Sequence, residues 1–332
     1  MTSTHQNYSS IENYYIDKHM SKLKELYPDD DFIAQEKVHG ANFSFQFYYD
    51  PINPDYRKIC CSSRSQRVGI LTETDGPDFY GTKNILLEKY KDIYLIRDKL
   101  FTTIDGILTA QIYGELFGGV YDNNGVKKIT SAKPIQKGIN YNPNNDFIIF
   151  DIRVQTYDKQ DFYLAYNEIN NLIQDTNLKF LQAMHFGKLE DLLKLNPVFE
   201  STIYAYYDLP KVTNNYAEGY VVKKYERRTV GDYNPIVKIK SPTFAEVTKN
   251  NHTVNHELNS KVKNIQDNYI NKNRVDAYKS KYPDAEKKVI ICGVIDDAIE
   301  EYLKLNPEEL TEKEVLTDKV RKAVSGKILQ FI

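Results

Sequence analysis

Strand-like segments fill the first part of this chain and stop at Pro242, and this change constrains the fold more than any other feature. Before it, apolar and polar residues alternate, or Ile, Val, Tyr and Phe concentrate, in segments 32–49, 58–62, 108–116, 146–156, 218–224 and 235–240. Helical spacing occurs between them, over 85–100 and 166–195. The pattern predicts an α+β domain of antiparallel sheets with flanking helices.

Beyond Pro242 the sequence predicts helices only, over roughly 255–281, 284–305 and 311–331. In the middle stretch, apolar residues recur every three or four positions and form one stripe: Val289, Cys292, Ile295, Ala298, Ile299 and Tyr302. We therefore predict two domains, the α+β domain over 1–243 and a small all-α domain over 244–332.

Composition narrows the class of protein. The chain is 41% hydrophobic and 27% charged, as in ordinary globular proteins. It has no apolar run near the ~20 residues that span a bilayer and no apolar signal segment at its start, so we expect no membrane association and no secretion. Its three cysteines lack zinc-site spacing. We expect a monomer in the cytoplasm, or in the host cytoplasm or nucleus for a viral protein.

Positive charge is local. The net charge of −2 argues against a protein that coats nucleic acid nonspecifically, because phosphate binding needs concentrated Lys and Arg. Between Lys211 and Asn250, however, eight basic residues stand against four acidic ones, which gives this segment a charge of +4. We call residues 211–250 the basic segment.

Lys37 is the residue that points most directly to chemistry. Segment 32–49 reads as two strands joined at a turn, with Lys37 and Gly40 in the connection. Neighbouring cations there would lower the pKa of the lysine and make its amine nucleophilic. A lysine followed by Gly three positions later is a short motif, and an ordinary surface lysine in a hairpin is the alternative.

The residues around Lys37 form the first of six ordered motifs that resemble the RNA ligase 2 family of covalent nucleotidyltransferases. The motifs are 36–43 (EKVHGANF), 62–64 (SSR), 113–118 (YGELFG), 147–152 (FIIFDI), 218–223 (EGYVVK) and 237–240 (VKIK), preceded by a family-like start at 8–13 (YSSIEN). The resemblance implies a nucleotidyltransferase domain of the ATP-grasp-like ligase type.

The same resemblance implies that Lys37 attacks the α-phosphate of ATP and becomes lysyl-AMP. Lys238 and Lys240 alternate on one strand, so they share a face and would lower the pKa of the nucleophile and hold the α-phosphate. A solvated strand face is the alternative explanation for two alternating lysines.

Further ATP contacts follow from the family pattern. Phe150 would stack on adenine, with core packing as the alternative, and Glu115 would contact the ribose, with a hydrated carboxylate as the alternative. The other expected ATP-binding residues are Glu36, Asn42, Arg64 and Lys223.

Glu218 resembles the family glutamate that holds Mg²⁺ through water, and Mn²⁺ could replace that ion. One carboxylate is enough, because Mg²⁺ keeps several waters and also binds substrate phosphates. His39 would assist at the leaving phosphates; a structural histidine is the alternative.

The implied function is ATP-dependent joining of RNA 3′-hydroxyl and 5′-phosphate ends through lysyl-AMP and RNA-adenylate, at nicks in duplex RNA. Arg227 and Arg228 would extend the phosphate-binding surface toward the RNA. One alternative is a DNA ligase or capping-type nucleotidyltransferase, although these usually carry a β-barrel where this chain is helical. The other is a non-catalytic protein that binds RNA ends.

Overall fold

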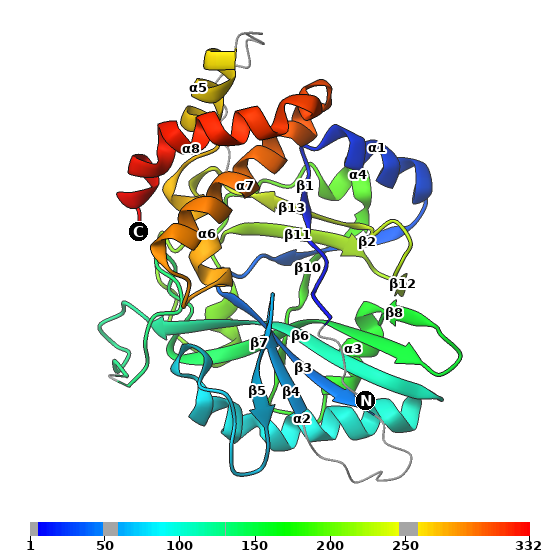
Figure 1. The fold of residues 1–332 in the computed structure, drawn as a ribbon. Helices are drawn as coiled ribbons and strands as arrows, with labels where there is room; N and C mark the ends of the chain where they lie inside the picture. Colours follow the sequence, from blue (N-terminus) through cyan, green and yellow to red (C-terminus); the bar gives the residue numbers. More distant parts are fainter. Residues whose placement is uncertain (1–5, 49–58, 130, 246–257) are drawn as a thin grey trace. The chain divides into compact units, whose positions relative to one another are not determined.

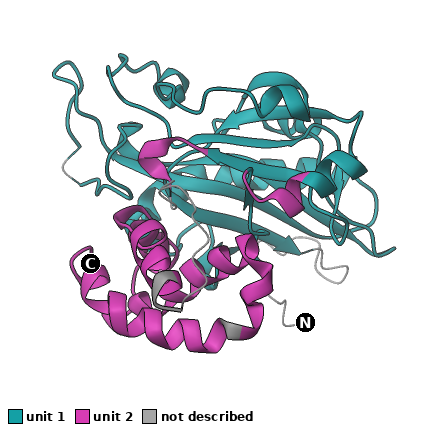
Figure 2. Cartoon of the chain, turned by 90° about the horizontal axis from the view of Figure 1, so that it is seen from above, with its two compact units in different colours: residues 1–14, 21–239 teal, residues 15–20, 240–332 magenta. Residues whose placement is uncertain are grey.

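The computed structural model describes residues 6–48, 59–129, 131–245 and 258–332. The chain forms two compact units. Unit 1 comprises Met1–Tyr14 and Ser21–Ile239, and unit 2 comprises Tyr15–Met20 and Lys240–Ile332 (Figure 2). The sequence placed its boundary after residue 243, whereas the contacts within each unit place it after Ile239 and assign a short N-terminal piece to unit 2.

Unit 1 contains two sheets, as the sequence predicts. The smaller sheet has five strands in the spatial order β1 (Glu12–Asn13), β13 (Ile236–Lys240), β11 (Gly219–Lys224), β2 (Asp31–Glu36) and β10 (Ala183–Lys188). β2 pairs antiparallel with both of its neighbours, β11 and β10, and the short β1 pairs parallel with β13.

The larger sheet has eight strands and lies below the first in Figure 1. Its main path runs β12 (Arg228–Thr229), β8 (Asp161–Tyr163), β7 (Asn142–Thr156), β6 (Ile107–Val120), β3 (Ala41–Tyr48), β4 (Ile59–Ser63) and β5 (Arg67–Leu71); β9 (Lys179–Phe180) pairs with β7 off this path. The predicted segments at 108–116 and 146–156 are the central, longest strands of this sheet.

Alternation along β3 gives the larger sheet two different faces. Phe43, Phe45 and Phe47 are at most 1% exposed and join a core with α2 (Lys83–Thr103) and α3 (Tyr166–Ile173). Successive strand residues point to opposite faces, so Asn42, Ser44 and Gln46 lie on the other face. This second, polar face looks toward the five-stranded sheet (Figure 1).

Two sequence predictions need correction. Segment 166–195 is not one helix, because α3 ends at Ile173 and β10 follows before the short α4 (Leu189–Leu192). The β10 residues show no strand alternation; they are extended because they pair with the edge of β2. Segment 32–49 is not a hairpin either, since β2 and β3 belong to different sheets.

Four further short elements lie in unit 1 or at its junctions with unit 2. These are α1 (Asp17–Leu26), which the sequence did not predict, and the 3₁₀ turns η1 (Phe79–Gly81), η2 (Ile203–Tyr207) and η3 (Pro242–Phe244).

Unit 2 is helical, as predicted, with α5 (Leu258–Asn268), α6 (Lys272–Lys281), α7 (Lys287–Leu305), η4 (Pro307–Glu312) and α8 (Lys313–Leu329). The predicted helix at 255–281 is two helices, because Asn271 accepts a hydrogen bond from the backbone N–H of Arg274 and caps α6. Residues 255–257 of that prediction lie outside the described residues.

A separate core holds these helices together. It includes Ile265, Ile295 and Val320, each fully buried. Arg274, 1% exposed, donates to Glu301 at 2.7 Å and to the carbonyl of Tyr269 at 2.8 Å, so the buried guanidinium is paired. Within the described part of the chain, no helix combines the length and apolar character needed to cross a membrane.

Candidate active site

Lys37 lies in the four-residue connection that passes from one sheet to the other. β2 ends at Glu36 and β3 begins at Ala41. The N–H of Lys37 donates to the carbonyl of Gly219 at 2.7 Å, which holds the connection against the start of β11. The strands on both sides of Lys37 and this backbone hydrogen bond therefore fix its position between the two sheets.

Glu218 brings two predicted catalytic residues together. Its Oε2 lies 3.0 Å from Lys37 Nζ and 3.4 Å from His39 Nδ1. The Glu218 side chain is 4% exposed, against 22% for Lys37 and 17% for His39. A buried carboxylate thus holds a partly exposed amine and a partly exposed imidazole at one point.

Gly40 allows the connection to pass close to β6. A Cβ atom at this position would overlap the carbonyl oxygen of Leu116 and press on the side chain of Glu115. Only glycine fits so close an approach. Its presence brings Glu115 beside the Lys37 connection.

Glu115 is electrostatically coupled to the other site residues. It lies opposite Asn42 in the β3–β6 pairing, so both side chains share the polar face. Burial raises the pKa of Glu115 to about 8; the positive charges of Lys37 and Arg64 oppose this shift and the Glu218 carboxylate adds to it. At neutral pH the carboxyl group is mostly protonated, and it can donate a hydrogen bond to an oxygen of a ligand.

A β-bulge at Phe150 changes the direction of its side chain. Asp151 pairs with Tyr113 and Ile149 with Gly114, so Phe150 is the extra residue of β7. Its ring is only partly buried and lies 5.0 Å, edge to face, from the ring of Tyr8. It is not part of the large core that includes α2, but it packs against a smaller buried cluster that contains Tyr8 and Tyr113, so its partly exposed face is the part that a flat ligand could stack on.

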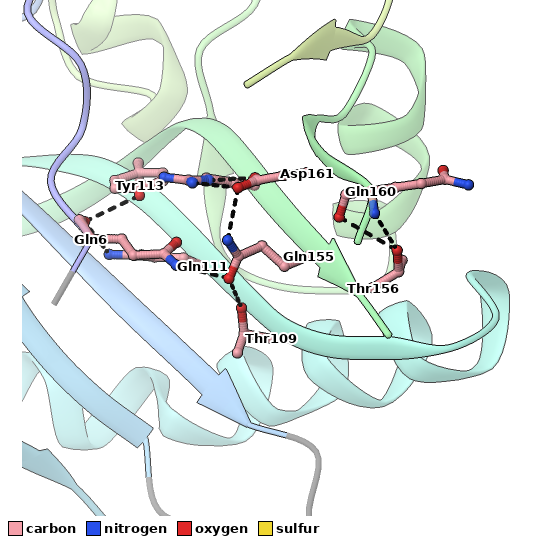
Figure 3. Close-up of polar contacts among 9 residues, drawn as sticks. Gln6, Thr109, Gln111, Tyr113, Gln155, Thr156, Gln160 and Asp161 are labelled. Carbon is pink, nitrogen blue, oxygen red and sulfur yellow. Dashed lines mark hydrogen bonds and ion pairs between the residues drawn. The ribbon is translucent and has the colours of Figure 1, made fainter. Parts of the chain in front are cut away.

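The N-terminal segment runs along the same polar face. Figure 3 shows the carbonyl of Gln6 accepting hydrogen bonds from Gln111 Nε2 and Tyr113 Oη, both at 3.2 Å. Gln6 Nε2 donates to Gln155 Oε1 at 2.7 Å. Further along, Arg64, in the turn after β4, donates to Ser10 Oγ at 2.9 Å. The family-like start of the chain is thus tied to the sheet that carries Glu115 and Phe150.

Lys223 and Arg228 lie in a buried ion cluster instead of an open phosphate site. Lys223 Nζ donates to Asp151 Oδ1 at 3.0 Å and to the carbonyl of Phe150 at 2.5 Å, and Arg228 Nη2 donates to Asp151 Oδ2 at 2.5 Å. Tyr8 Oη also donates to Asp151 Oδ2, at 2.5 Å. All three charged residues are at most 4% exposed. The geometry does not support the expected ATP contact of Lys223 or the expected RNA contact of Arg228.

The charged groups of this cluster shift one another's pKa values. Burial would raise the pKa of Asp151, but Arg228 and Lys223 outweigh it and hold that pKa below its usual value. Burial lowers the pKa of Lys223 to about 8, against the opposing effect of Asp151. The cluster joins β7 to β11 and fixes the backbone at Phe150.

Three further residues were predicted to contact ATP: Lys238, Lys240 and Glu36. Lys238 and Lys240 are both partly exposed with buried Ile239 between them, so they share one face of β13. Glu36 faces away from solvent, where it accepts hydrogen bonds from Ser201 Oγ at 2.6 Å and Thr202 N at 2.7 Å. Burial raises the pKa of its carboxyl group despite these bonds.

Several site residues were missed by the sequence reading. Tyr141, 2% exposed, accepts a hydrogen bond from the N–H of His39 at 2.8 Å. Asp151 accepts the hydrogen bonds that hold the ion cluster together, and Tyr8 donates one of them. A charged residue inside the apolar run 147–152 was the signal for Asp151, because a carboxylate in a buried strand needs a cation. No local signal indicated Tyr141.

The donor set fits a divalent ion that is held mainly by water and phosphate. In the described ranges, no three His, Cys, Asp or Glu side chains gather to form a complete metal cage. Mg²⁺ needs only one or two carboxylates beside substrate oxygens. Glu218, next to Lys37, is the carboxylate that can serve.

Comparisons with known proteins point to one family. The RNA ligase family model matches residues 30–240. The mitochondrial RNA-editing ligase 2 of Trypanosoma brucei brucei is 29% identical over 242 residues, which cover 66% of this chain and 56% of that protein. The chain thus spans a little over half the length of this relative.

Solved structures of Naegleria gruberi RNA ligase are also similar. A mutant with ATP and Mn and the protein with pyrophosphate each give a TM-score of 0.45 at 17% identity. Each match covers 73% of this chain and 58% of the other.

Proposed function

Because this chain belongs to the RNA ligase family, we propose that it is an ATP-dependent RNA ligase that joins a 3′-hydroxyl to a 5′-phosphate. The observation that carries the proposal is the meeting of Lys37, His39 and Glu218 at one point, beside Glu115. A nucleophilic amine, a carboxylate and an imidazole at this spacing suit nucleotidyl transfer.

In the first step the Lys37 amine attacks the α-phosphorus of ATP. The N–P bond forms, the bond from the α-phosphorus to the bridging oxygen breaks, pyrophosphate leaves and the amine loses a proton. Lys238, Lys240 and His39 stabilise negative charge on the phosphates. Glu218 would hold Mg²⁺ through water, and the bound ion supplies further neutralisation of phosphate charge.

The nucleoside lies on the polar face in this proposal. Phe150 stacks on adenine, protonated Glu115 donates to a ribose oxygen, and Arg64 and Asn42 contact further ribose or phosphate oxygens. Phe150 and Glu115 lie on adjacent strands of the larger sheet, so one sheet holds both ends of the nucleoside.

Two transfers complete the reaction. A 5′-phosphate oxygen of RNA attacks the lysyl-AMP phosphorus and releases the Lys37 amine, giving RNA-adenylate. The 3′-hydroxyl then attacks the 5′-phosphorus, forms the phosphodiester bond and expels AMP. We propose nicked duplex RNA as the substrate and a monomer as the active form.

The compartment we propose is a reducing one, such as the cytoplasm. Cys60 and Cys61 are buried free thiols, and Cys292 is also free. Free thiols persist where disulfides are not favoured.

The first test is covalent labelling. Incubation with Mg²⁺ and ATP labelled at the α-phosphate should label the protein, and Lys37→Ala should abolish the label. Lys99→Ala is the matched control: Lys99 lies on α2 and pairs with Asp175, so its loss should leave labelling unchanged. Label that survives Lys37→Ala would refute the proposed nucleophile.

A second assay compares polymers. Sealing should be faster on a nicked RNA duplex than on single-stranded RNA or nicked DNA. Preference for nicked DNA would replace the RNA assignment with a DNA ligase.

A further inference from the structure

The basic segment that the sequence singles out is largely neutralised in the folded protein. Lys223 and Arg228 share Asp151, and Arg227 pairs with Glu168. Lys211 pairs with Glu200 and Lys224 with Asp30. These five side chains therefore offer phosphate no free cation, and Lys249, the last basic residue of the segment, lies outside the described residues.

A loop between β6 and β7 supplies such cations. It comprises residues 121–129 and 131–141, and we call it the lysine loop; Figure 1 draws it at the left, beyond the end of β6. Lys127, Lys128, Lys133 and Lys137 are all exposed. Asp122 is the one acidic residue of the loop, which therefore carries +3 in a chain of net charge −2.

The four lysines differ from those of the basic segment in their partners. Their side-chain amines form no ion pair and no hydrogen bond with any residue that the structure describes. Phosphate oxygens can therefore approach these exposed amines without breaking a salt bridge to a described residue.

Specific contacts hold the middle of the lysine loop in place, at Lys133. Asn145, 3% exposed, donates to the carbonyl of Lys133 at 2.7 Å and accepts from its N–H at 3.3 Å. Gly119 has φ +88°, and a Cβ there would overlap the Lys133 carbonyl. Two independent features thus fix the backbone at Lys133.

The second half of the loop contacts the Lys37 connection. Gln136 Nε2 donates to the carbonyl of Gly40 at 3.3 Å, and Tyr141 Oη accepts from the N–H of His39 at 2.8 Å. Lys137 follows Gln136 directly. The C-terminal part of the lysine loop therefore lies against the connection that carries the nucleophile, so a polynucleotide whose end is held at Lys37 would pass this loop.

We propose that the lysine loop binds the phosphate backbone of the RNA whose end reacts at Lys37. This proposal rests on the proposed RNA ligase function. Lysines bind phosphates as point charges without reading bases, so the loop would raise affinity for the polynucleotide and leave the reaction with ATP unchanged.

The test uses the full chain with all four lysines changed to Gln. A control variant changes four exposed or half-exposed lysines that have acidic partners elsewhere, Lys22, Lys99, Lys188 and Lys194, and alters the net charge equally. Binding of a nicked RNA duplex with a 5′-phosphate is measured from 50 to 200 mM KCl, together with self-labelling by ATP and thermal unfolding.

We expect the lysine-loop variant to label itself at the wild-type rate and to bind RNA at least about 10-fold more weakly at 50 mM KCl. The slope of log K against log[salt] should become shallower by about 2 to 4, since each lost phosphate contact removes about 0.9. The control variant should keep most of the wild-type affinity and slope.

Three results would overturn the proposal: unchanged RNA affinity and slope, an equal loss in the control variant, or loss of self-labelling in a lysine-loop variant that unfolds at the wild-type temperature. These results are distinct from failure of the proposed function, in which the wild-type protein itself would neither label with ATP nor seal RNA.

Discussion

At the scale of single residues, the site depends on groups whose neighbours change their chemistry. Glu218 is a buried carboxylate shared by Lys37 and His39, and Gly40 removes the side chain that would keep β6 away. Glu115 is the residue with the clearest consequence for pH, because burial raises its pKa to about 8.

Glu115→Gln should therefore change how stability depends on pH. A carboxyl group whose pKa rises on folding binds more protons in the folded state between its unfolded value, near 4.5, and about 8. Wild-type stability then falls as pH rises through this window, because ionising the folded group costs free energy. Glutamine removes that cost.

The measurement is urea unfolding followed by far-ultraviolet circular dichroism at pH 5 and pH 8. The variant should gain on the order of 1 kcal/mol relative to wild type between these pH values, a modest figure because Glu115 is partly accessible and solvent screens its interactions. Parallel stability curves for the two proteins would show that the Glu115 carboxyl group is not perturbed.

At the scale of elements, two sheets are joined by polar contacts as well as by chain connections. The Asp151 cluster ties β7 to β11, and the backbone of the Phe150 bulge is one of its hydrogen-bond partners. A cluster of this kind fixes geometry, because removing one member leaves the others charged and buried.

Asp151→Asn should therefore destabilise the protein by about 3–5 kcal/mol, since Lys223 and Arg228 lose their shared counter-charge inside the protein. Asp175→Asn is the matched control: Asp175 is 78% exposed in its pair with Lys99, so its loss should cost at most about 1 kcal/mol. Chemical denaturation of both variants checks this. A cost below about 1 kcal/mol for Asp151→Asn would contradict the role given to the cluster.

The strands were predictable where pattern and burial coincide. β3 and β7 followed from alternation or from apolar runs, because each buries one face in a core. β10 could not be predicted, since its residues become a strand only by pairing with β2. The change of sheet between β2 and β3 was hidden for the same reason: alternation shows that a segment is extended, without identifying its partner.

At the scale of the whole molecule, the distribution of charge depends on partners far apart in sequence. The basic segment was visible in the sequence, but its partners Asp30, Asp151 and Glu168 lie outside it. The lysine loop could not be singled out from the sequence, because four lysines in 21 positions are common. Folding pairs five residues of the first set and leaves all four of the second exposed, so surface charge could not be predicted from local composition.

We propose above all that Lys37 carries AMP from ATP to RNA. The most direct measurement isolates the protein labelled from ATP, removes all free ATP, and adds nicked duplex RNA with a 5′-phosphate and a 3′-hydroxyl. Mass spectrometry should locate AMP on the peptide containing Lys37; after RNA is added, that label should disappear, free AMP should be released and the nick should be sealed. AMP on another residue, or label on Lys37 that stays while the RNA remains nicked, would contradict the claim.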